Sequence, residues 1–538
     1  MKKRSRKLAL LLAACMLAST LMGCSGGTGV EESTSAGTEA VQPEGQEEGT
    51  SDGKEQAQAE GEYETLDIFI NESWWPVDTF TGIIPDEIKE AIGVDLNVTV
   101  VADDSQLGLM IASNELPDLI FTQKELDRLS RPEACYSYNE LLEQYAPDYE
   151  FPEIQVSIAK SFSSDDDYYT ILGNFNTAEE WAQSPVPAGQ MAMYYRQDIY
   201  EELGSPKLEN LDDLMNVCAM VKEKYPDMIP IATDLYYRLR LINAWMGGSG
   251  NEKYQYMDDG SVVFKTDSPV YYDWLKYCNQ LARNGYVDAE NYASTNIEDT
   301  LQIVGNGEAF IYLSYLKPSD LNNVNTRLHG TNSDADFVIC APLGQTSYST
   351  SKGWCGLFVS RSCDNPEAAI RFITYMFSDE GRRLSKWGRE GIEWTMDENG
   401  MPHWSEEWLS TLNNTEEMNK KYNQFFYFGA NAIEDVMADY GTVSEEDMPK
   451  WEAYSEGYEC YPELQIAAPL PSSDEGVIET KLMDMLDAEE ARVIFAEDDE
   501  AFESAYQSLQ EKAEQIGVDT LNAYMTENVA VVKEEYGF

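Results

Sequence analysis

Apolar residues recur along the chain with a period of two in some segments and of about 3.6 in others, which predicts strands and helices in turn. Proline near the start of the first predicted helix and Gly93 just beyond its end mark that helix's boundaries. The order strand, helix, strand, helix, strand is typical of an open parallel sheet with helices on both faces. The segments are a strand at 65–70, a helix at 85–92, a strand at 94–101, a helix around 107–111 and a strand at 116–121.

The same order begins again further along, with a strand at 191–196, a helix at 211–223 and a strand at 229–232. Polar turn residues between extended segments predict hairpins at 257–264 and 394–400. Beyond Ala488 the spacing is helical almost throughout. The positions there that we expect to face inward are Val493, Phe502, Tyr506, Leu509, Ile516 and Leu521.

The first residues form an export signal. Basic residues occupy much of 2–7, an apolar run follows from Leu8 to Leu17, and small residues precede Cys24. The apolar run is shorter than the roughly 20 residues of a spanning helix. Leu21–Cys24 resembles the lipobox that signal peptidase II cuts, so we expect residues 1–23 to be removed and Cys24 to be lipidated. An ordinary secretory signal or a signal anchor is the alternative.

Residues 25–62 are mostly Gly, Ser, Thr, Glu and Gln, with almost no large apolar side chain. Such a composition cannot bury enough surface to fold, so we expect 24–62 to be a lipidated cysteine followed by a disordered acidic tether. No later apolar run approaches membrane-spanning length. The sequence therefore predicts a lipid-anchored protein on the extracytoplasmic face of a bacterial membrane.

Charge excludes one class of partner. The formal net charge is −60, and removal of the basic signal makes it more negative. Nucleic acid would be repelled, because binding its phosphates needs a concentrated basic surface. We expect the acidity to serve surface solubility.

The residues for common catalytic and metal sites are missing from the sequence. Only His329 and His403 are present, without an HExxH, GxSxG or Cys-His signature, so we expect neither a metal, a cofactor nor an enzyme. A glycosidase needs only two carboxylates and stays an alternative. The cysteines of the body are widely spaced and form no CxxC pair, which favours buried free thiols over disulfides. They are Cys135, Cys218, Cys278, Cys340, Cys355, Cys363 and Cys460.

Four stretches together resemble extracellular solute-binding protein family 1, in its large lipoprotein branch found mainly in Firmicutes. They carry a helix that leads into "LPDL", a "YRQDIYEELG" segment, an "NGEAFI" strand entry, and "NPEAAI" followed by "FSDEG" and "GREGIEW". Their order and their occurrence with a lipobox make the resemblance specific. The residues are 109–120, 194–204, 306–311, 365–370, 377–381 and 388–394. Residues 168–187 match no part of the family pattern.

The resemblance implies an α/β fold, the two-lobe periplasmic-binding-protein-like fold of type II, with a hinged ligand cleft between the lobes. A body this long also exceeds one hydrophobic core, which favours two lobes. We expect 63–175 plus about 290–345 in the first lobe, and 176–289 plus about 346–538 in the second. The resemblance further implies an ABC permease as partner, and we expect a monomer.

Ligands on open sheets bind at the carboxyl ends of the strands, and sugars need flat aromatic faces with hydrogen-bonding side chains around them. Asn71, Trp74 and Trp75 directly follow the first strand and fit this requirement. Tyr195 and the other candidates also have structural interpretations, in a strand, a core or an ion pair. The other predicted ligand-binding residues are Asp103, Tyr195, Arg238, Arg240, Trp245, Tyr312, Tyr315 and Trp354.

The sequence thus predicts a lipid-anchored solute-binding protein that captures a carbohydrate, an oligosaccharide above all, and delivers it to an ABC importer. Two alternatives stay open at this point. One is the same architecture binding a peptide or another small solute. The other is a surface adhesin or sensor without a transport role.

Overall fold

Two four-stranded sheets organise the part of the chain that the structure describes. The computed structural model describes residues 63–538 except 104, 166, 345–348, 350–352, 399, 413–414, 424–425, 441–442 and 537–538. The predicted signal, Cys24 and the acidic tether lie outside the described residues. Among the helices that are described, none combines the length and apolar character needed to cross a membrane.

The first sheet has the strand order β10-β3-β1-β2. Strand β1 (Glu64–Ile70) runs parallel to both β2 (Val94–Val100) and β3 (Leu119–Thr122), as the sequence predicts. Strand β10 (Gly356–Val359) joins from far along the chain and pairs antiparallel with β3. All four residues of β3 and of β10 are buried, because helices cover both faces of the sheet.

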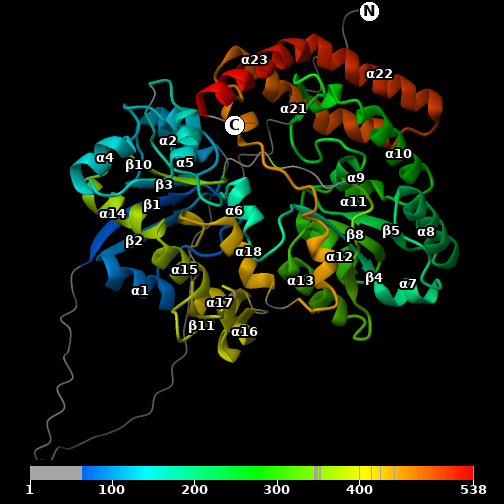
Figure 1. Ribbon diagram of the computed structural model, residues 1–538, viewed down its shortest axis with the longest axis horizontal. Coiled ribbons are helices and arrows are strands. Elements are labelled where there is room, and N and C mark those ends of the chain that lie inside the picture. The colour runs from blue at the N-terminus through cyan, green and yellow to red at the C-terminus, as the bar shows by residue number, and fades with distance from the viewer. Residues whose placement is uncertain are drawn as a thin grey trace, which may run out of the picture. The chain divides into compact units, whose positions relative to one another are not determined.

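The helices beside this sheet come from two separate stretches of the chain, blue to cyan and yellow in Figure 1. Helix α1 ends at Gly93, whose left-handed backbone (φ 72°) caps it as predicted. Helix α14 packs against α4 and α15. The bounds are α1 (Ile83–Ile92), α2 (Gln106–Ser113), α3 (Leu126–Leu129), α4 (Tyr138–Tyr145), α5 (Glu153–Lys160), α14 (Pro366–Met376), α15 (Asp379–Trp387), β11 (Trp394–Met396), β12 (Pro402–Trp404), α16 (Glu406–Leu412), α17 (Thr415–Lys421) and the 3₁₀ turn η2 (Phe426–Phe428).

The second sheet has the order β5-β8-β4-β9. Its central strand β8 (Ala309–Tyr315) runs parallel to β5 (Ile229–Thr233) and antiparallel to β4 (Met191–Arg196). Strand β9 (Phe337–Ile339) pairs with the other edge of β4. Six of the seven residues of β8 are buried, which identifies this strand as the centre of the second core.

Helices and two short strands surround the second sheet, and the C-terminal helices, orange to red in Figure 1, pack beside α10. The bounds are α6 (Ala178–Ala182), α7 (Gln197–Glu202), α8 (Leu211–Lys224), α9 (Arg240–Trp245), β6 (Tyr254–Tyr256), β7 (Val262–Phe264), the 3₁₀ turn η1 (Lys265–Asp267), α10 (Tyr271–Arg283), α11 (Ala289–Ala293), α12 (Ile297–Gly305), α13 (Pro318–His329), α18 (Ala432–Tyr440), α19 (Met448–Glu452), α20 (Pro462–Ile466), α21 (Asp474–Ile494), α22 (Asp499–Ile516) and α23 (Val518–Tyr536).

The strand pairing corrects the predicted lobe boundaries. Residues 309–315 and 337–339 were expected with the first sheet, but they form β8 and β9 of the second. Residues 356–359 were expected in the second lobe, yet they form β10 of the first sheet. The reason is that β10 enters antiparallel, a connection that the parallel strand–helix rhythm does not signal.

Two hydrophobic clusters accompany the two sheets. One surrounds β1, β2, β3, β10 and α14. The other surrounds β4, β5 and β8, continues into the C-terminal helices, and also includes Phe69, Ile120 and Phe358 of the first sheet. All seven cysteines of residues 63–538 are free, and only Cys460 is not fully buried. Free thiols are therefore the observed state, as the sequence favours.

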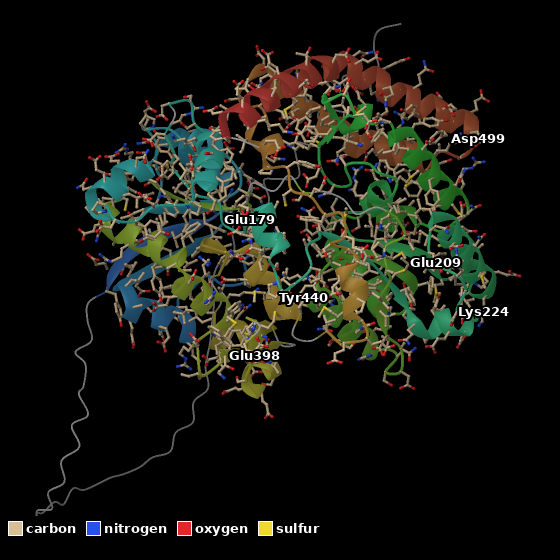
Figure 2. All side chains as sticks on the ribbon, in the orientation of Figure 1. Glu179, Glu209, Lys224, Glu398, Tyr440 and Asp499 are labelled. Carbon is tan, nitrogen blue, oxygen red and sulfur yellow. The ribbon has the colours of Figure 1, made fainter. Side chains whose placement is uncertain are left out.

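Most carboxylates lie at the surface, where Glu209 and Asp499 project outward in Figure 2. Carboxylates inside a protein require partners, so the exceptions identify special environments. The acidic residues that are buried in the described part of the chain are Glu72, Asp127, Asp234, Glu393, Glu463, Glu489 and Glu490. Asp234 among them directly follows β5, and Glu72 lies two residues beyond the end of β1.

Candidate functional site

The carboxyl end of β1 carries a short polar turn. The Asn71 backbone N–H donates to the Phe121 carbonyl at 2.9 Å, which continues the pairing of β1 with β3. The buried Asn71 side chain donates from Nδ2 to Thr122 Oγ1 at 3.0 Å. Asn71 therefore ties the two strand ends together and positions the residues that follow it.

Three rings meet just beyond this turn, and we call Trp74, Trp354 and Tyr427 the aromatic shelf. The Trp74 ring centroid lies 5.6 Å from that of Trp354 and 5.3 Å from that of Tyr427, and the latter two are 5.3 Å apart. Trp74 is 47% exposed, whereas Trp75 behind it is 6% exposed and stacks on Phe428 at 5.5 Å. A solvent-facing aromatic surface thus rests on a buried aromatic support.

Glu72 fixes the outermost ring of the shelf. Its Oε2 accepts a hydrogen bond from Trp74 Nε1 at 2.9 Å, and its Oε1 accepts one from Gln123 Nε2 at 2.9 Å. The Cys355 thiol also donates to Oε1 at 3.6 Å. Because these groups come from β1, β3 and β10, the sheet itself sets the orientation of Trp74.

The carboxyl ends of β5 and β8 carry a different set of side chains. Asp234 directly follows β5 and is fully buried, and its Oδ1 accepts the backbone N–H groups of Tyr236 and Tyr237 at 2.8 and 2.7 Å. Tyr315 ends β8, and its ring lies 4.6 Å from Tyr237 and 6.0 Å from Tyr236, which is 52% exposed. Burial raises the pKa of Asp234, against the lowering effect of the Tyr237 N–H.

Helix α18 supplies two carboxylates to the segment after β8. Asp435 pairs with Lys317 at 3.3 Å and with Lys386 at 2.6 Å, so one carboxylate joins a lysine beside each sheet. Asp439 lies 3.9 Å from Lys317 and accepts a hydrogen bond from Ser319 at 2.9 Å. Burial opposes ionisation of Asp435, but the two lysines outweigh it and hold its pKa well below the usual range.

Helix α15 contacts both η2 and α18, which brings these groups close to the turn that carries Tyr427. Burial raises the pKa of Tyr427, and the charges of Asp435, Asp439 and Asp320 add to the effect while Lys317 opposes it. Asp320, on α13, has its pKa raised to about 6, first by burial. The shelf of the first sheet and the charged groups that follow the second sheet therefore act on one another.

Several predicted ligand residues lie away from this arrangement. Tyr195 of β4 packs on Tyr200 at 4.7 Å. Tyr312 is buried in the second sheet, and the charge of Asp234 adds to burial in raising the pKa of its hydroxyl. Asp103 is exposed, and the Ser105 hydroxyl and backbone N–H donate to it at 2.5 and 2.9 Å, which lowers the pKa of the Asp103 carboxyl. These three residues have structural roles in a strand, a core and a turn.

Arg238 and Arg240 have different environments. The Arg240 guanidinium forms a bidentate pair with buried Glu490 of α21 at 2.9 and 2.5 Å. The Arg238 guanidinium lies 5.1 Å from the Tyr292 ring centre, and its Nε has no hydrogen-bond partner among the described residues. Trp245 is 5% exposed and ends α9. Arg240 thus serves the fold, whereas Arg238 keeps hydrogen-bonding capacity on the loop after β5.

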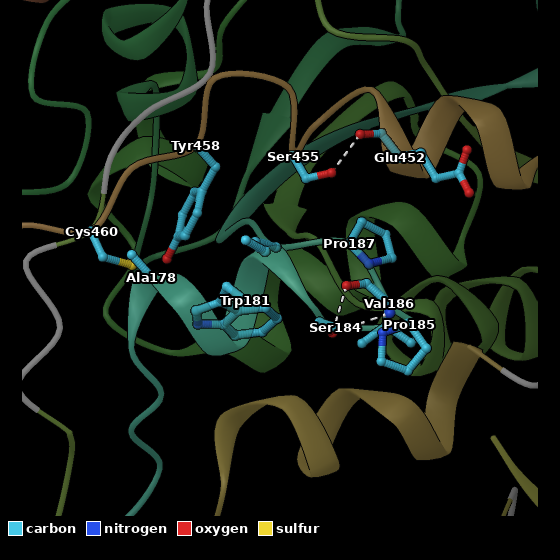
Figure 3. Close-up of a pocket in the computed structure, with 12 residues that line it drawn as sticks. Ala178, Trp181, Ser184, Pro185, Val186, Pro187, Glu452, Ser455, Tyr458 and Cys460 are labelled. Atoms are coloured by element: carbon cyan, nitrogen blue, oxygen red, sulfur yellow. Dashed lines mark hydrogen bonds between the residues drawn. The ribbon is translucent and has the colours of Figure 1, made fainter. Parts of the chain in front are cut away.

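A cavity of about 360 Å³ lies along the segments that precede β4 and follow α19. Trp181 of α6 and Tyr458 face it in Figure 3, with their ring centres 6.4 Å apart. Pro185 and Pro187 line the cavity as well, so residues 178–188, the segment before β4, form one wall. A second cavity of about 540 Å³ begins at Pro76, next to the aromatic shelf.

Tyr427 was missed by the sequence predictions, since it lies in the turn η2 with no strand before it. Asp234 and Asp320 were missed too, although an acidic residue directly after β5 was a usable signal. The described residues contain no group of three or more His, Cys, Asp or Glu side chains that could hold a metal ion.

The sequence of this chain matches a known protein family. A family model described as bacterial extracellular solute-binding protein matches residues 84–388, more than half of the chain. The chain belongs to this family. The match includes β1's partners β2 and β3, the entire second sheet and β10, so this solute-binding protein carries the family pattern across both sheets.

Solved structures share the fold of this solute-binding protein. Alginate-binding protein AlgQ2 is 18% identical with a TM-score of 0.64, over 87% of this chain and 98% of that one. The substrate-binding protein FusA of the S. pneumoniae ABC transporter, in complex with kestose, is 15% identical with a TM-score of 0.66, over 88% and 100%. The N-glycan transport protein NgtS of Streptococcus pneumoniae is 12% identical with a TM-score of 0.55, over 88% and 99%.

A comparison with the sequences of characterised proteins found no match. The structural matches confirm the predicted two-lobe α/β fold. Their low sequence identity means that they establish the architecture and leave the ligand to be argued from this chain's own residues.

Proposed function

We propose that this solute-binding protein captures an oligosaccharide outside the cytoplasm and delivers it to an ABC importer. The observation that carries the proposal is the aromatic shelf, where Trp74 offers a 47% exposed indole held in place by Glu72. Sugar rings present apolar faces that stack on aromatic rings, and hydroxyl edges that need polar partners. The residues after β5 and β8 supply such polar groups.

The structural neighbours support a carbohydrate ligand. One is named for alginate, one was solved with kestose and one is named for N-glycan transport. In this proposal the ligand lies between a lobe of residues 63–175 plus about 354–430 and a lobe of about 190–340 plus 448–538. The lobes close on the ligand, since binding energy selects the closed state.

The same proposal includes three features of the sequence. Lipidation of Cys24 anchors the protein, the acidic tether extends from the membrane, and the closed monomer docks on the permease subunits. Because the protein hands its ligand on, we expect the oligosaccharide to be returned chemically intact, without turnover.

The test is calorimetric titration of the chain from residue 25 with oligosaccharides and, in parallel, short peptides. We expect a saturable signal with one glycan class, and Trp74→Ala to weaken it about 10- to 30-fold through lost stacking area. Ile392→Ala is the matched control, because Ile392 is 57% exposed and outside the shelf. Binding of peptides alone would replace the oligosaccharide, and glycan binding unchanged in Trp74→Ala would exclude the shelf.

A further inference from the structure

The cations near the aromatic shelf are already engaged. Lys317 and Lys386 share the carboxylate of Asp435 at 3.3 and 2.6 Å, and Asp439 lies 3.9 Å from Lys317. A ligand anion would have to displace these short contacts. The two lysines are therefore poor candidates for binding a negatively charged group.

One carboxylate in the same region has an oxygen that is free to accept a hydrogen bond. Asp234 is fully buried, and its Oδ2 has no hydrogen-bond partner in the described part of the chain, although its Oδ1 accepts two backbone N–H groups. A buried acceptor without a donor is costly, so a donor from outside the chain would stabilise it. Asp234 thus points to a ligand that donates hydrogen bonds.

Asp234 acts electrostatically on its surroundings together with Asp320. Burial raises the pKa of Tyr315 first, and the charges of Asp234 and Asp320 raise it further. The same two carboxylates act on Tyr237 beside Tyr315. The geometry agrees, because the Asp234 backbone N–H donates to the Leu313 carbonyl of β8 at 3.1 Å. Asp320 lies in the first turn of α13, which begins shortly after Tyr315.

The shelf contributes a third carboxylate. Glu72 is 6% exposed and accepts hydrogen bonds from Trp74 and Gln123, so it needs no ligand itself. Its charge still acts on whatever stacks against Trp74. Arg238 is the opposing charge on the loop after β5, and its backbone N–H donates to the Asp234 carbonyl at 3.1 Å. The nearby Lys317, whose charge acts on Asp320, is already paired with Asp435 and Asp439.

We propose that the ligand is an uncharged oligosaccharide whose hydroxyl groups donate hydrogen bonds to Asp234 and Asp320, and that glycans bearing carboxylate or sulfate groups are excluded. This inference rests on the proposed function and narrows it. Sugar hydroxyls are good donors to carboxylates, and hydrogen bonds to a charged acceptor are the strong ones. A uronate in the same place would set like charges together in a partly dry site. The chain would then differ in specificity from its fold neighbour named for alginate, a polymer of uronic acids.

The experiment compares neutral and anionic glycans of equal length. Malto-, manno-, xylo- and fructo-oligosaccharides form the neutral set, and oligogalacturonates, oligomannuronates and sulfated oligosaccharides form the anionic set. Calorimetric titration of the chain from residue 25 should show binding within the neutral set and at least 100-fold weaker binding of every anionic probe. Asp234→Asn and Asp320→Asn should each lower the affinity for the neutral glycan about 10-fold.

Asp259→Asn is the matched control. Asp259 lies in an exposed turn, where its side chain accepts the Ser261 backbone N–H at 3.0 Å. Like Asp234 it caps a turn, but it lies outside the proposed site. Melting temperatures show whether each variant is folded, and Asp320→Asn keeps the test decisive if Asp234→Asn unfolds. Binding of an anionic glycan in preference to neutral ones would overturn the inference and leave the proposed function standing. Full affinity in both carboxamide variants would also overturn it, and no binding by any glycan would overturn both proposals.

Discussion

The ends of the two sheets offer a ligand opposite kinds of surface. The first sheet ends in stacked rings, with Trp74 exposed over a buried support of Trp75 and Phe428. The second ends in acids and tyrosine hydroxyls, with Asp234 and Tyr315 among them. The end of the first sheet therefore offers apolar contact, and the end of the second offers hydrogen-bonding groups.

This difference separates affinity from selection. Aromatic contact is tolerant of ring identity, because stacking depends on area. Carboxylates select, because each requires a donor at a defined position and repels an anion. We expect substitutions at the first sheet to change how tightly glycans bind, and substitutions at the second to change which glycans bind. Three further predictions separate residues that support these surfaces from those that form them.

The largest expected effect concerns the buried pair behind the second sheet. Glu490 accepts two hydrogen bonds from Arg240 and one from Tyr271 at 2.8 Å. Burial opposes its charge, but Arg240 outweighs burial and lowers the pKa of Glu490. Glu490→Ala leaves Arg240 charged and unpaired, and should lower the free energy of unfolding by about 4 kcal/mol. Urea denaturation measures this.

The exposed pair of Arg283 with Asp499 is the comparison for that variant. The Asp499 side chain is 88% exposed, so Asp499→Ala should change the free energy of unfolding by less than about 0.5 kcal/mol. Equal losses in the two variants would show that the Arg240 pair does not support the second sheet.

A somewhat smaller effect is expected behind the first sheet. Trp75 is 6% exposed and packs on Phe121 and Phe428, so Trp75→Ala should cost about 3 kcal/mol of folding stability by leaving a cavity. Trp74→Ala should cost about 1 kcal/mol, because that side chain is already half exposed. Chemical denaturation measures the stability loss of both variants. A greater loss for Trp74→Ala would show that Trp74, and not Trp75, supports the fold.

The smallest expected effect is a pH dependence at the second sheet. The pKa of Asp320 is raised to about 6 by burial and by Asp439, Asp234 and Asp435, against the opposing charge of Lys317. The folded protein therefore holds this proton more tightly than the unfolded chain. Its contribution to stability is full below about pH 4 and is lost as the pH rises through 6.

Asp320→Asn removes that contribution to the pH dependence. The wild-type free energy of unfolding, minus that of the variant, should fall by up to about 2 kcal/mol between pH 4 and pH 7. Denaturation curves at a series of pH values measure the difference. A difference that stays flat, or that rises with pH, would show that Asp320 is not protonated in the folded state at mildly acidic pH.

The sequence predicted well where a residue's role follows from its immediate neighbours in the chain. The strand before Trp74, the proline and Gly93 around α1, and the helices after Ala488 were all visible as local patterns, and the structure has them. Trp74, Trp75 and Trp354 were expected at a strand-end site because they flank apolar runs, and they do come together. Placement beside a strand, after it for Trp74 and Trp75 and before it for Trp354, was the usable signal.

Prediction failed where partners are distant in the chain. Nothing near Arg240 indicates that Glu490, 250 positions away, pairs with it. Tyr427 joins the aromatic shelf from a turn that no pattern marks. The place of residues 356–359 in the first sheet was missed for the same reason, since β10 reaches β3 by an antiparallel pairing across about half of the body. Such contacts are fixed by the complete packing and have no local signature.

The late entry of β10 also sets an order of events during synthesis and export. The four strands of the second sheet lie within residues 191–339, so that sheet can close once this stretch has emerged. The first sheet must wait for residues 356–359, and the hydrogen bond from Tyr138 Oη to the Leu357 carbonyl spans 219 positions. The edge of β3 therefore stays open while a whole second sheet is being built, which makes it the stretch most in need of protection from wrong pairing in a newly exported chain.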